Sequence, residues 1–525
     1  MIEANEFVYN DDMNRLRALI TLHAPVIFAS LVLLLGCGLT LTWYRHAINP
    51  DGISYITIAE KYARGDFAGA VNGYWGPLYS WLLSPFARLG LDMQLGAKLV
   101  GACMGVLALF AAFHIMRQWK VKPLHIYVGL GILVPVLLFW IMSGPITPDM
   151  LVLAVFLGYV YMLGRAPSLK SGLLAGLLAG LGFLAKAYML PFFAVHFLFM
   201  VLYAYKTSSN REFRNTYKNY FAGMALVFAV LAVPWIVLLS NKYHKPTYST
   251  AASYNFALLN QDKPGHPMEY LGLLPPGSGT AASVWEDPSY MKQASWSPLG
   301  SRRDMGWAVR TFFDNLKRAG AAFLEFSALA PAGLLALGVY ILHKKRKLGT
   351  KQIMAVSAMV VYTAGYILIN AEYRYFWPVY ICLFLLGVYY FGVSRLDLSV
   401  WARRAFVGIV LATVAVTPLT QVYYQRNRQV APRYIADELT PYIKPGEHVA
   451  SDDFASIAYC FYLRAACYGK LNESLGTTKN RAQLTANKIT KVIIMQGDED
   501  WQKPDYLDGF SEIKRVGLTV LLAKN

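Results

Sequence analysis

The stretch VIFASLVLLLGCGLTL, residues 26–41, decides the class of fold of this chain. It contains no charged side chain, and a helix that crosses a bilayer needs roughly 20 mostly apolar residues. Residues 151–163 and 224–239 are similar, and such runs recur about eleven times before residue 425. We therefore expect an integral membrane protein that crosses the bilayer many times.

Composition supports this interpretation. The chain has 525 residues, of which 56% are hydrophobic and 15% are charged, whereas soluble domains carry roughly a quarter charged residues. The net charge of +18 could suggest nucleic acid, but membrane proteins gather Lys and Arg in their cytoplasmic loops. The basic residues here follow that pattern, so we expect no nucleic-acid partner.

The apolar runs place the expected helices along the first 424 residues, which form an all-α polytopic membrane bundle. We expect helices near residues 18–42, 96–116, 123–142, 150–164, 172–187, 189–205, 221–240, 319–342, 352–370, 375–393 and 405–424. Residues 425–525 have a different pattern. Strands are expected at 447–451, 491–495 and 517–523, and helices at 432–440 and 455–463, which together predict a small C-terminal α/β domain.

The distribution of Lys and Arg predicts the orientation in the cell (inner) membrane. One set of alternate loops is rich in basic residues and is expected in the cytoplasm with the N-terminus: 117–122, 165–170, 206–218, 344–351 and 395–404. The opposite side then holds a first outer loop, a long outer loop and the C-terminal domain, which would be periplasmic or extracellular: residues 43–95, 241–318 and 425–525. In that location Cys460 and Cys467 could form a disulfide, although the sequence does not decide it.

The first outer loop contains two segments, residues 53–62 and 78–89, with aromatic-rich apolar residues at helical spacing. They are expected to form short amphipathic helices at the membrane interface. Charged side chains close to a membrane are costly and tend to be functional. Those expected at outer helix ends are Asp51, Asp66, Asp149, Lys186, Glu325, Glu372 and Arg374.

Such a group suits chemistry on an anionic lipid head group. A carboxylate can take a proton from a hydroxyl, and Lys and Arg can hold a phosphate. Simpler roles are also open. Asp51 lies in an Asn-Pro-Asp-Gly turn and could only cap a helix, as could Asp149, and Lys186 could only extend to the interface.

Five short segments resemble the GT-C glycosyltransferases, the polyprenyl-phosphate-sugar-dependent enzymes that include the protein O-mannosyltransferases and the lipid A aminoarabinose transferase. The segments follow one another in the same order as in that family, and they lie at the helix ends that are expected on the outer side. The segments are NPDGISY at 49–55, GYWGPLY at 73–79, ITPD at 146–149, GFLAK at 182–186 and EYRY at 372–375. The resemblance covers about the first 400 residues and implies the GT-C fold.

The resemblance also implies an activity and its residues. An inverting glycosyltransferase would use Asp51 as the catalytic base, with Asp149 orienting a substrate or sharing a divalent metal with Asp51. Lys186 and Arg374 would neutralise the phosphate of the leaving polyprenyl phosphate. The further residues expected at the substrate are Glu372, Tyr55, Tyr74, Trp75 and Tyr375. No cofactor is required, although a divalent cation would be compatible with the two Asp residues.

One difference from the family pattern concerns the first outer loop. Protein mannosyltransferases carry Asp-Glu where this chain has Asp51-Gly52, so a second carboxylate is missing here or comes from elsewhere. The partners expected are a polyprenyl-phosphate sugar, membrane lipid and a glycan, lipid or protein acceptor in the cell envelope. The sugar and the acceptor stay open. The alternative functions are a transporter or flippase, or a polymerase or ligase, for lipid-linked saccharides.

Overall fold

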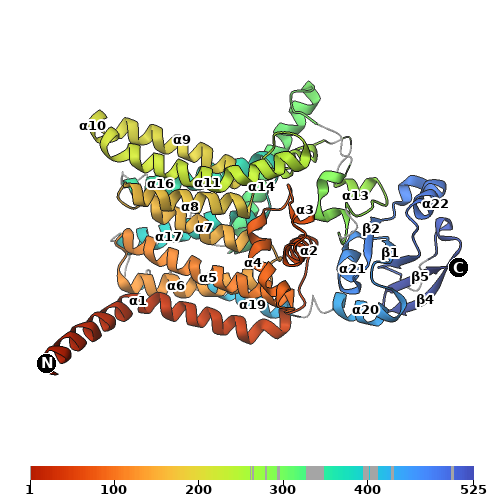
Figure 1. Ribbon diagram of the computed structural model, residues 1–525, viewed down its shortest axis with the longest axis horizontal. Coiled ribbons are helices and arrows are strands. Elements are labelled where there is room, and N and C mark those ends of the chain that lie inside the picture. The colour runs from red at the N-terminus through yellow and green to blue at the C-terminus, as the bar shows by residue number, and fades with distance from the viewer. Residues whose placement is uncertain are drawn as a thin grey trace.

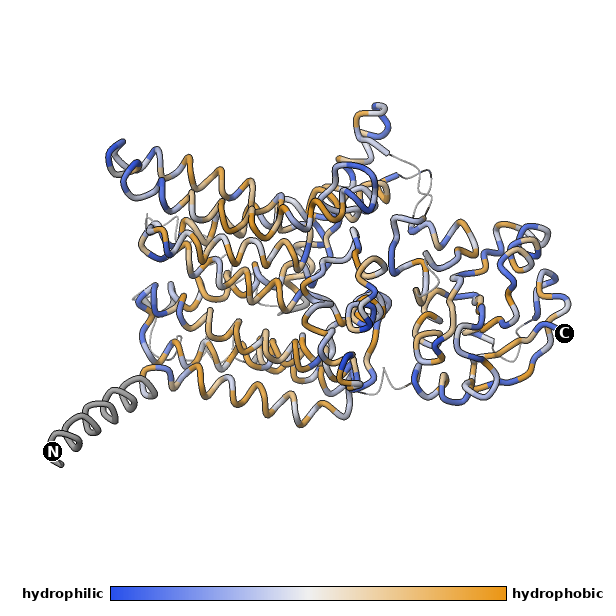
Figure 2. Tube along the Cα trace, in the orientation of Figure 1, coloured by the Kyte–Doolittle hydropathy of each residue, from blue (hydrophilic) through white to orange (hydrophobic). Residues whose placement is uncertain are grey.

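The structure is a computed structural model that describes residues 2–260, 262, 265–277, 281–291, 296–326, 348–393, 401, 412–426, 431–497 and 502–525. Long helices lie side by side in a bundle, and a small sheet lies beyond one end of it (Figure 1). Hydrophobic residues dominate along the bundle helices, hydrophilic residues gather at the helix ends, and the part around the sheet contains both kinds (Figure 2). The N-terminus is at the end of the bundle away from the sheet.

The bundle helices follow the apolar runs closely. They are α1 (Ile2–Tyr44), α5 (Met93–Gln118), α6 (Pro123–Met142), α7 (Asp149–Leu163), α8 (Leu169–Ala185), α9 (Met189–Thr207), α11 (Lys218–Tyr243), α16 (Thr350–Ile369) and α17 (Trp377–Val393). Nine of the expected helices are thereby confirmed to within a few residues. The first extends further than expected, because α1 continues through the polar residues back to Ile2.

Within the described residues, six helices are long and apolar enough to cross a membrane. They are Thr21–Tyr44, Met93–Gln118, Pro123–Met142, Met189–Thr207, Phe213–Tyr243 and Thr350–Ile369. The helices α7 and α8 are apolar but shorter. The chain is therefore a multi-pass membrane protein, while the expected number of about eleven crossings stays a prediction. Most of the expected helix 319–342 lies outside the described residues. Of the expected helix 405–424, residues 412–424 are described and are helical, as the π-helix η5 (Ala412–Val416) followed by α19 (Thr417–Tyr424).

Three helices of the first outer loop lie at the end of the bundle that faces the sheet (Figure 1). They are α2 (Pro50–Arg64), α3 (Phe67–Ala70) and α4 (Pro77–Arg88). A proline occupies the first position of both α2 and α4, where the missing N–H costs nothing and the ring presets the helical φ angle. Gly65 ends α2 in the left-handed conformation with φ 81°. The two helices expected in this loop are confirmed.

The long outer loop is more structured than the sequence suggested. It contains α12 (Ala251–Ala257), α13 (Pro267–Tyr270) and two 3-10 turns, η2 (Val284–Glu286) and η3 (Pro288–Tyr290). The helix α14 (Arg302–Phe326) begins well before the expected start at residue 319. Its first half combines arginines with apolar side chains, so it lacks the uniformly apolar character by which a membrane-spanning helix is recognised.

The C-terminal segment folds as a five-stranded sheet with helices. Its strands are β1 (His448–Ser451), β2 (Ala466–Lys470), β3 (Lys491–Ile494), β4 (Phe510–Val516) and β5 (Thr519–Lys524), in the order β2-β1-β3-β5-β4. The pairs β1–β2 and β1–β3 are parallel, whereas β3–β5 and β4–β5 are antiparallel. The helices are α20 (Ala431–Leu439), α21 (Ile457–Leu463) and α22 (Gly476–Ala486). All three strands and both helices expected here are present, and β2, β4 and α22 are additional.

The long outer loop joins the free edge of this sheet at β2. Ser283 forms a parallel bridge with Cys467, whose backbone N–H donates to the carbonyl of Ala282 at 2.8 Å. The N–H of Leu274 donates to the carbonyl of Tyr468 at 2.8 Å. The loop therefore closes an edge that would otherwise expose unpaired backbone groups. Cys460 and Cys467 are both buried and are free thiols in the structure.

Candidate active site

Three carboxylates from distant segments converge on the guanidinium of Arg374. Its Nη2 atom lies 2.9 Å from Oδ2 of Asp51, and its Nε atom lies 2.7 Å from Oε2 of Glu372. The same Nε atom is 3.7 Å from Oδ2 of Asp149. Arg374 is only 11% exposed, so these charges interact with little screening by water.

Lys186 adds a second cation to this cluster. Its Nζ atom is 2.8 Å from Oδ1 of Asp149 and lies 3.6 Å from the centre of the Tyr375 ring. The hydroxyl of Tyr375 donates to Oε1 of Glu372 at 3.0 Å. Burial lowers the pKa of Lys186, although the carboxylate of Asp149 opposes that effect. Three carboxylates thus face two cations at the expected outer helix ends.

Short local motifs bring these groups together. Asp51 is in the first turn of α2, and the side chain of Asn49 accepts the backbone N–H of Ile146 at 2.8 Å. This bond fixes the turn before α7, at whose first residue Asp149 lies. The hydroxyl of Thr147 donates to Oδ2 of Asp149 at 2.7 Å. Asn49 and Thr147 therefore fix the positions of Asp51 and Asp149 relative to each other.

Gly52 shows why a second carboxylate cannot follow Asp51 in this chain. A Cβ atom at Gly52 would be 2.7 Å from Cβ of Ile146 and 2.8 Å from Oδ1 of Asn49. Any side chain there would push α2 away from the turn that holds Asp149. The neighbouring acidic group at this site comes instead from Glu372, far along the chain.

Trp285 is the main site residue that sequence reasoning missed. Its indole Nε1 donates to Oδ1 of Asp51 at 3.0 Å, so Asp51 is held through both oxygens, by Trp285 and by Arg374. Trp285 belongs to η2 in the long outer loop, where no periodic pattern marks it. The only feature of the sequence that could have pointed to Trp285 is a tryptophan in a loop, next to apolar and acidic residues.

The expected aromatic residues form a wall around Asp51. Trp75 lies between Tyr55 and Tyr74, with ring centres 5.1 and 4.5 Å away. Trp285 completes the wall, with its ring centre 5.5 Å from that of Tyr74 and 5.8 Å from that of Trp75. His266 of α13's N-terminal cap lies 5.2 Å from Trp285. Faces of aromatic rings of this kind can pack against a sugar.

Two acidic residues after Trp285 hold it in place, Glu286 against α2 of the first outer loop and Asp287 against the end of α11. Glu286 forms a buried ion pair with Lys61 and accepts a hydrogen bond from Thr57 at 2.7 Å. Asp287 accepts a hydrogen bond from Tyr243 at 2.8 Å. Breaking a buried pair leaves a charge without compensation, which costs about 3–5 kcal/mol. The position of Trp285 is therefore well fixed.

Of the two remaining charged candidates, Asp66 lies apart from the cluster and the side chain of Glu325 lies outside the described residues. The side chain of Asp66 accepts the backbone N–H of Gly69 at 2.9 Å and caps α3, so its role is structural. Among the described residues, no group of three or more His, Cys, Asp or Glu side chains is arranged to hold a metal ion. The shared metal suggested for Asp51 and Asp149 stays a prediction.

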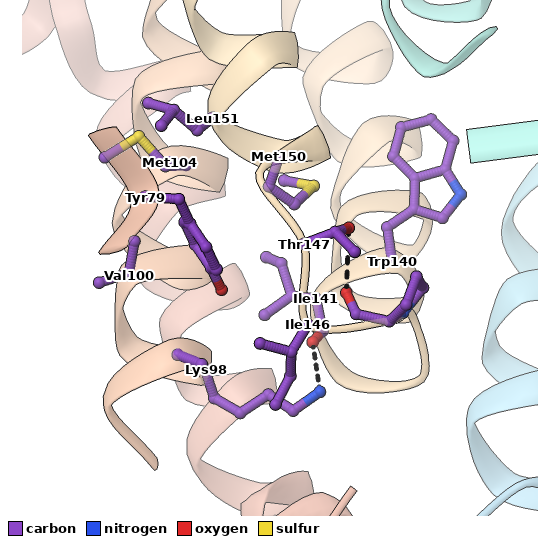
Figure 3. Close-up of a pocket in the computed structure, with 13 residues that line it drawn as sticks. Tyr79, Lys98, Val100, Met104, Trp140, Ile141, Ile146, Thr147, Met150 and Leu151 are labelled. Carbon is purple, nitrogen blue, oxygen red and sulfur yellow. Dashed lines mark hydrogen bonds between the residues drawn. The ribbon is translucent and has the colours of Figure 1, made fainter. Parts of the chain in front are cut away.

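A small cavity of about 20 Å³ lies behind the site, between α5, α6 and the turn before α7 (Figure 3). Lys98 lines it and donates to the carbonyls of Ile141 and Met142, 3.0 and 2.8 Å away. These carbonyls end α6 and lack partners within the helix, so Lys98 satisfies them. The cavity has room for about one water molecule, which makes it a packing feature and not a substrate site.

No protein-family model matches the sequence, and no curated protein matches it. The structure is similar to ArnT from Cupriavidus metallidurans bound to undecaprenyl phosphate, with a TM-score of 0.59 and 15% identity over 95% of this chain and 98% of that chain. The apo form of that ArnT gives a TM-score of 0.52 at 15% identity over 93% and 97% of the two chains.

A second similar structure is the apo oligosaccharyltransferase of Archaeoglobus fulgidus. Its TM-score is 0.53, with 12% identity over 90% of this chain and 69% of that chain. These neighbours are GT-C glycosyltransferases. At such low identity the likeness establishes the fold, and the GT-C fold expected from the five segments is confirmed.

Proposed function

We propose that this chain is an inverting glycosyltransferase that moves a sugar from a polyprenyl-phosphate donor to an acceptor hydroxyl on the outer face of the membrane. The observation that carries the proposal is the convergence of Asp51, Asp149 and Glu372 on Arg374 beside Lys186. The ArnT structure to which this chain is similar contains undecaprenyl phosphate, which supports a donor of that class.

Asp51 is the proposed base because it is the more accessible of the two aspartates. It is 17% exposed, whereas Asp149 is 4% exposed and bound to Thr147 and Lys186. Asp51 takes the proton of the acceptor hydroxyl as its oxygen attacks the anomeric carbon. The bond from that carbon to the phosphate oxygen breaks, polyprenyl phosphate leaves, and the anomeric configuration inverts.

The proposed phosphate site is formed by Arg374 and Lys186. Glu372 is 37% exposed and occupies one edge of the Arg374 guanidinium. The donor phosphate would displace the Glu372 carboxylate from that edge. Asp149 holds both cations in position and acts as a positioning residue. Stabilisation of the negative charge that develops on the leaving phosphate is the contribution we assign to the two cations.

Sugar transfer by the purified protein in nanodiscs tests this proposal. A panel of polyprenyl-phosphate sugars is supplied with membrane extract as acceptor, and release of polyprenyl phosphate is measured. Asp51→Asn should reduce turnover about 10²–10⁴-fold, the contribution expected of a general base, with donor binding retained. Asp453→Asn, in the C-terminal segment, is the matched control and should keep wild-type turnover.

Other outcomes redirect the assignment. Turnover that survives in Asp51→Asn would contradict Asp51 as the base and direct attention to Glu372. Failure to consume any donor, together with movement of lipid-linked saccharide across the vesicle membrane, would favour the transporter or flippase. Extension of a glycan chain by lipid-linked oligosaccharides would favour a polymerase or ligase.

A further inference from the structure

A large cleft lies between the first outer loop and the C-terminal segment, away from the aspartate cluster. Its volume is about 940 Å³, within the range of sites that hold sizeable ligands. One wall consists of the second half of α2 and the turn between α4 and α5. The other wall consists of α20, α21 and the strands β1 and β2, and the long outer loop closes one side.

The cleft is separated from Asp51 by the body of α2. Glu60 lines the cleft and follows Asp51 by nine residues, which is about two and a half helical turns. Its side chain therefore leaves the helix on the side opposite Asp51, roughly 14 Å further along the axis. A ligand in this cleft would not occupy the catalytic site.

The charge of the lining is predominantly positive. Four arginines line the cleft from both walls, Arg64 and Arg88 on the bundle side and Arg433 and Arg464 on the C-terminal side. Two carboxylates line the cleft, and both have partners. Asp92 caps α5 and forms an ion pair with Arg45 at 3.2 Å. Glu60 lies 3.8 Å from Arg64. The cleft thus has an excess of cationic groups.

Arg88 and Arg464 are the most available of these cations. Arg64 and Arg433 each have a carboxylate within 4 Å, whereas among the described residues no ion pair is recorded for Arg88 or Arg464. The backbone of Arg464 has a left-handed φ of 54° and its carbonyl accepts the N–H of Gly446 at 2.8 Å. A side chain other than glycine is uncommon in that conformation, so this arginine is held at the cleft at some cost.

Two tyrosines, Tyr462 and Tyr468, also line the cleft. Tyr462 lies under Arg433, 5.0 Å from its guanidinium carbon, and donates to the carbonyl of His46 at 2.9 Å. That bond, together with the one from Gln94 to the same hydroxyl, ties the C-terminal wall to the bundle wall. Tyr468 packs against His448, with ring centres 4.7 Å apart. The hydrogen bonds of Tyr462 therefore join the two walls of the cleft, and its ring contacts Arg433.

We propose that this cleft is a binding site for an anionic saccharide, one that carries phosphate or carboxylate groups, with Arg88 and Arg464 as its main contacts. Guanidinium groups bind both anions in bidentate fashion, and the tyrosines can pack against sugar rings. The choice of a saccharide rests on the proposed glycosyltransferase function, whereas the anion-binding surface does not. Such a site would retain an acceptor glycan beside the catalytic centre.

Binding of defined oligosaccharides to the full-length protein in nanodiscs tests the proposal. The probes are hexagalacturonate, which is anionic, and maltohexaose, which is neutral. We expect hexagalacturonate to bind and maltohexaose not to bind. The double variant Arg88→Gln, Arg464→Gln should weaken hexagalacturonate binding at least about tenfold, or 1.4 kcal/mol. Lys479→Gln removes an exposed cation of α22 outside the cleft and should leave the affinity unchanged.

Two controls keep the result interpretable. If thermal unfolding shows that the double variant is misfolded, the single variants Arg88→Gln and Arg464→Lys replace it, each with a smaller expected loss. Asp51→Asn should bind hexagalacturonate as wild type does while losing transfer, so the two proposals can fail separately. The proposal is wrong if the folded arginine variants bind normally, if maltohexaose binds as tightly, or if hexagalacturonate does not bind.

Discussion

At the scale of single residues, the site depends on how Asp51 is held. Arg374 contacts one carboxylate oxygen and Trp285 the other, so the carboxylate is oriented before any substrate arrives. Orientation of this kind lowers the entropy that must be lost on the way to the transition state. The sequence indicates Asp51, Asp149, Lys186, Glu372 and Arg374 because each lies at a helix end that is expected on the outer side. It could not identify Trp285, whose contact with Asp51 depends on how a long loop folds back.

Replacing Trp285 tests this orientation. Trp285→Phe keeps an aromatic ring against Tyr74 and Trp75 but removes the N–H that donates to Asp51. We expect kcat/KM to fall about 10- to 100-fold, because a hydrogen bond to a charged group contributes about 1.5–3 kcal/mol. The measurement is steady-state transfer with the best donor of the panel.

Trp296→Phe is the matched control for this experiment. Trp296 lies in the same loop, and its indole N–H also donates to an aspartate, Asp304, at 2.9 Å. The control should transfer at the wild-type rate. Equal losses in the two variants would mean that the loop as a whole, and not the contact with Asp51, accounts for the effect.

At the scale of elements, the sequence predicts the apolar helices well and the polar ones poorly. The helix α6 begins and ends at the expected residues because Pro123 and a continuous apolar run define it. The strand β4 was missed because it is an edge strand whose residues are mostly exposed, so the alternation of apolar and polar residues is absent. The helix α22 was missed because its sequence, GTTKNRAQLTA, has almost no apolar face.

The junction of α2 with the turn before α7 provides a test at this scale. Gly52→Ala places a Cβ within 2.8 Å of both Ile146 and Asn49, so we expect a loss of about 1–3 kcal/mol in the free energy of unfolding and a loss of transfer. Thermal unfolding and the transfer assay measure the two effects.

Gly131→Ala provides the control for this clash. It is another glycine within a helix, but no atom lies within 4 Å of the Cβ position there. Since alanine favours helix over glycine by up to about 1 kcal/mol, this variant should be at least as stable as wild type. A Gly52→Ala variant with wild-type stability and transfer would show that α2 and the turn can separate without harm.

At the scale of the whole molecule, the bundle, the first outer loop and the C-terminal sheet are joined at one end. The long outer loop pairs with β2 through Ser283 and reaches Asp51 two residues later through Trp285. The sheet and the catalytic carboxylate are therefore connected by a very short segment. The sequence indicated that these parts share one side of the membrane, but the pairing with β2 depends on a strand that it did not reveal.

The proposed orientation in the membrane can be tested by cysteine labelling in intact cells. Lys479→Cys and Lys122→Cys place exposed thiols at the two ends of the molecule, in a Cys103→Ser background that leaves only buried cysteines. We expect a membrane-impermeant thiol reagent to label residue 479 and not residue 122. Labelling of residue 122 alone would place the site in the cytoplasm and contradict a reaction at the outer face.

The most direct test of the central claim is the anomeric configuration of the product. A single displacement with Asp51 as base inverts the donor carbon, so a β-linked polyprenyl-phosphate sugar should yield an α-linked product. The one-bond carbon–proton coupling of the isolated product distinguishes the two configurations by NMR. An α linkage is the result we expect. A β linkage would require a covalent sugar–enzyme intermediate or a different reaction, and would contradict the role assigned to Asp51.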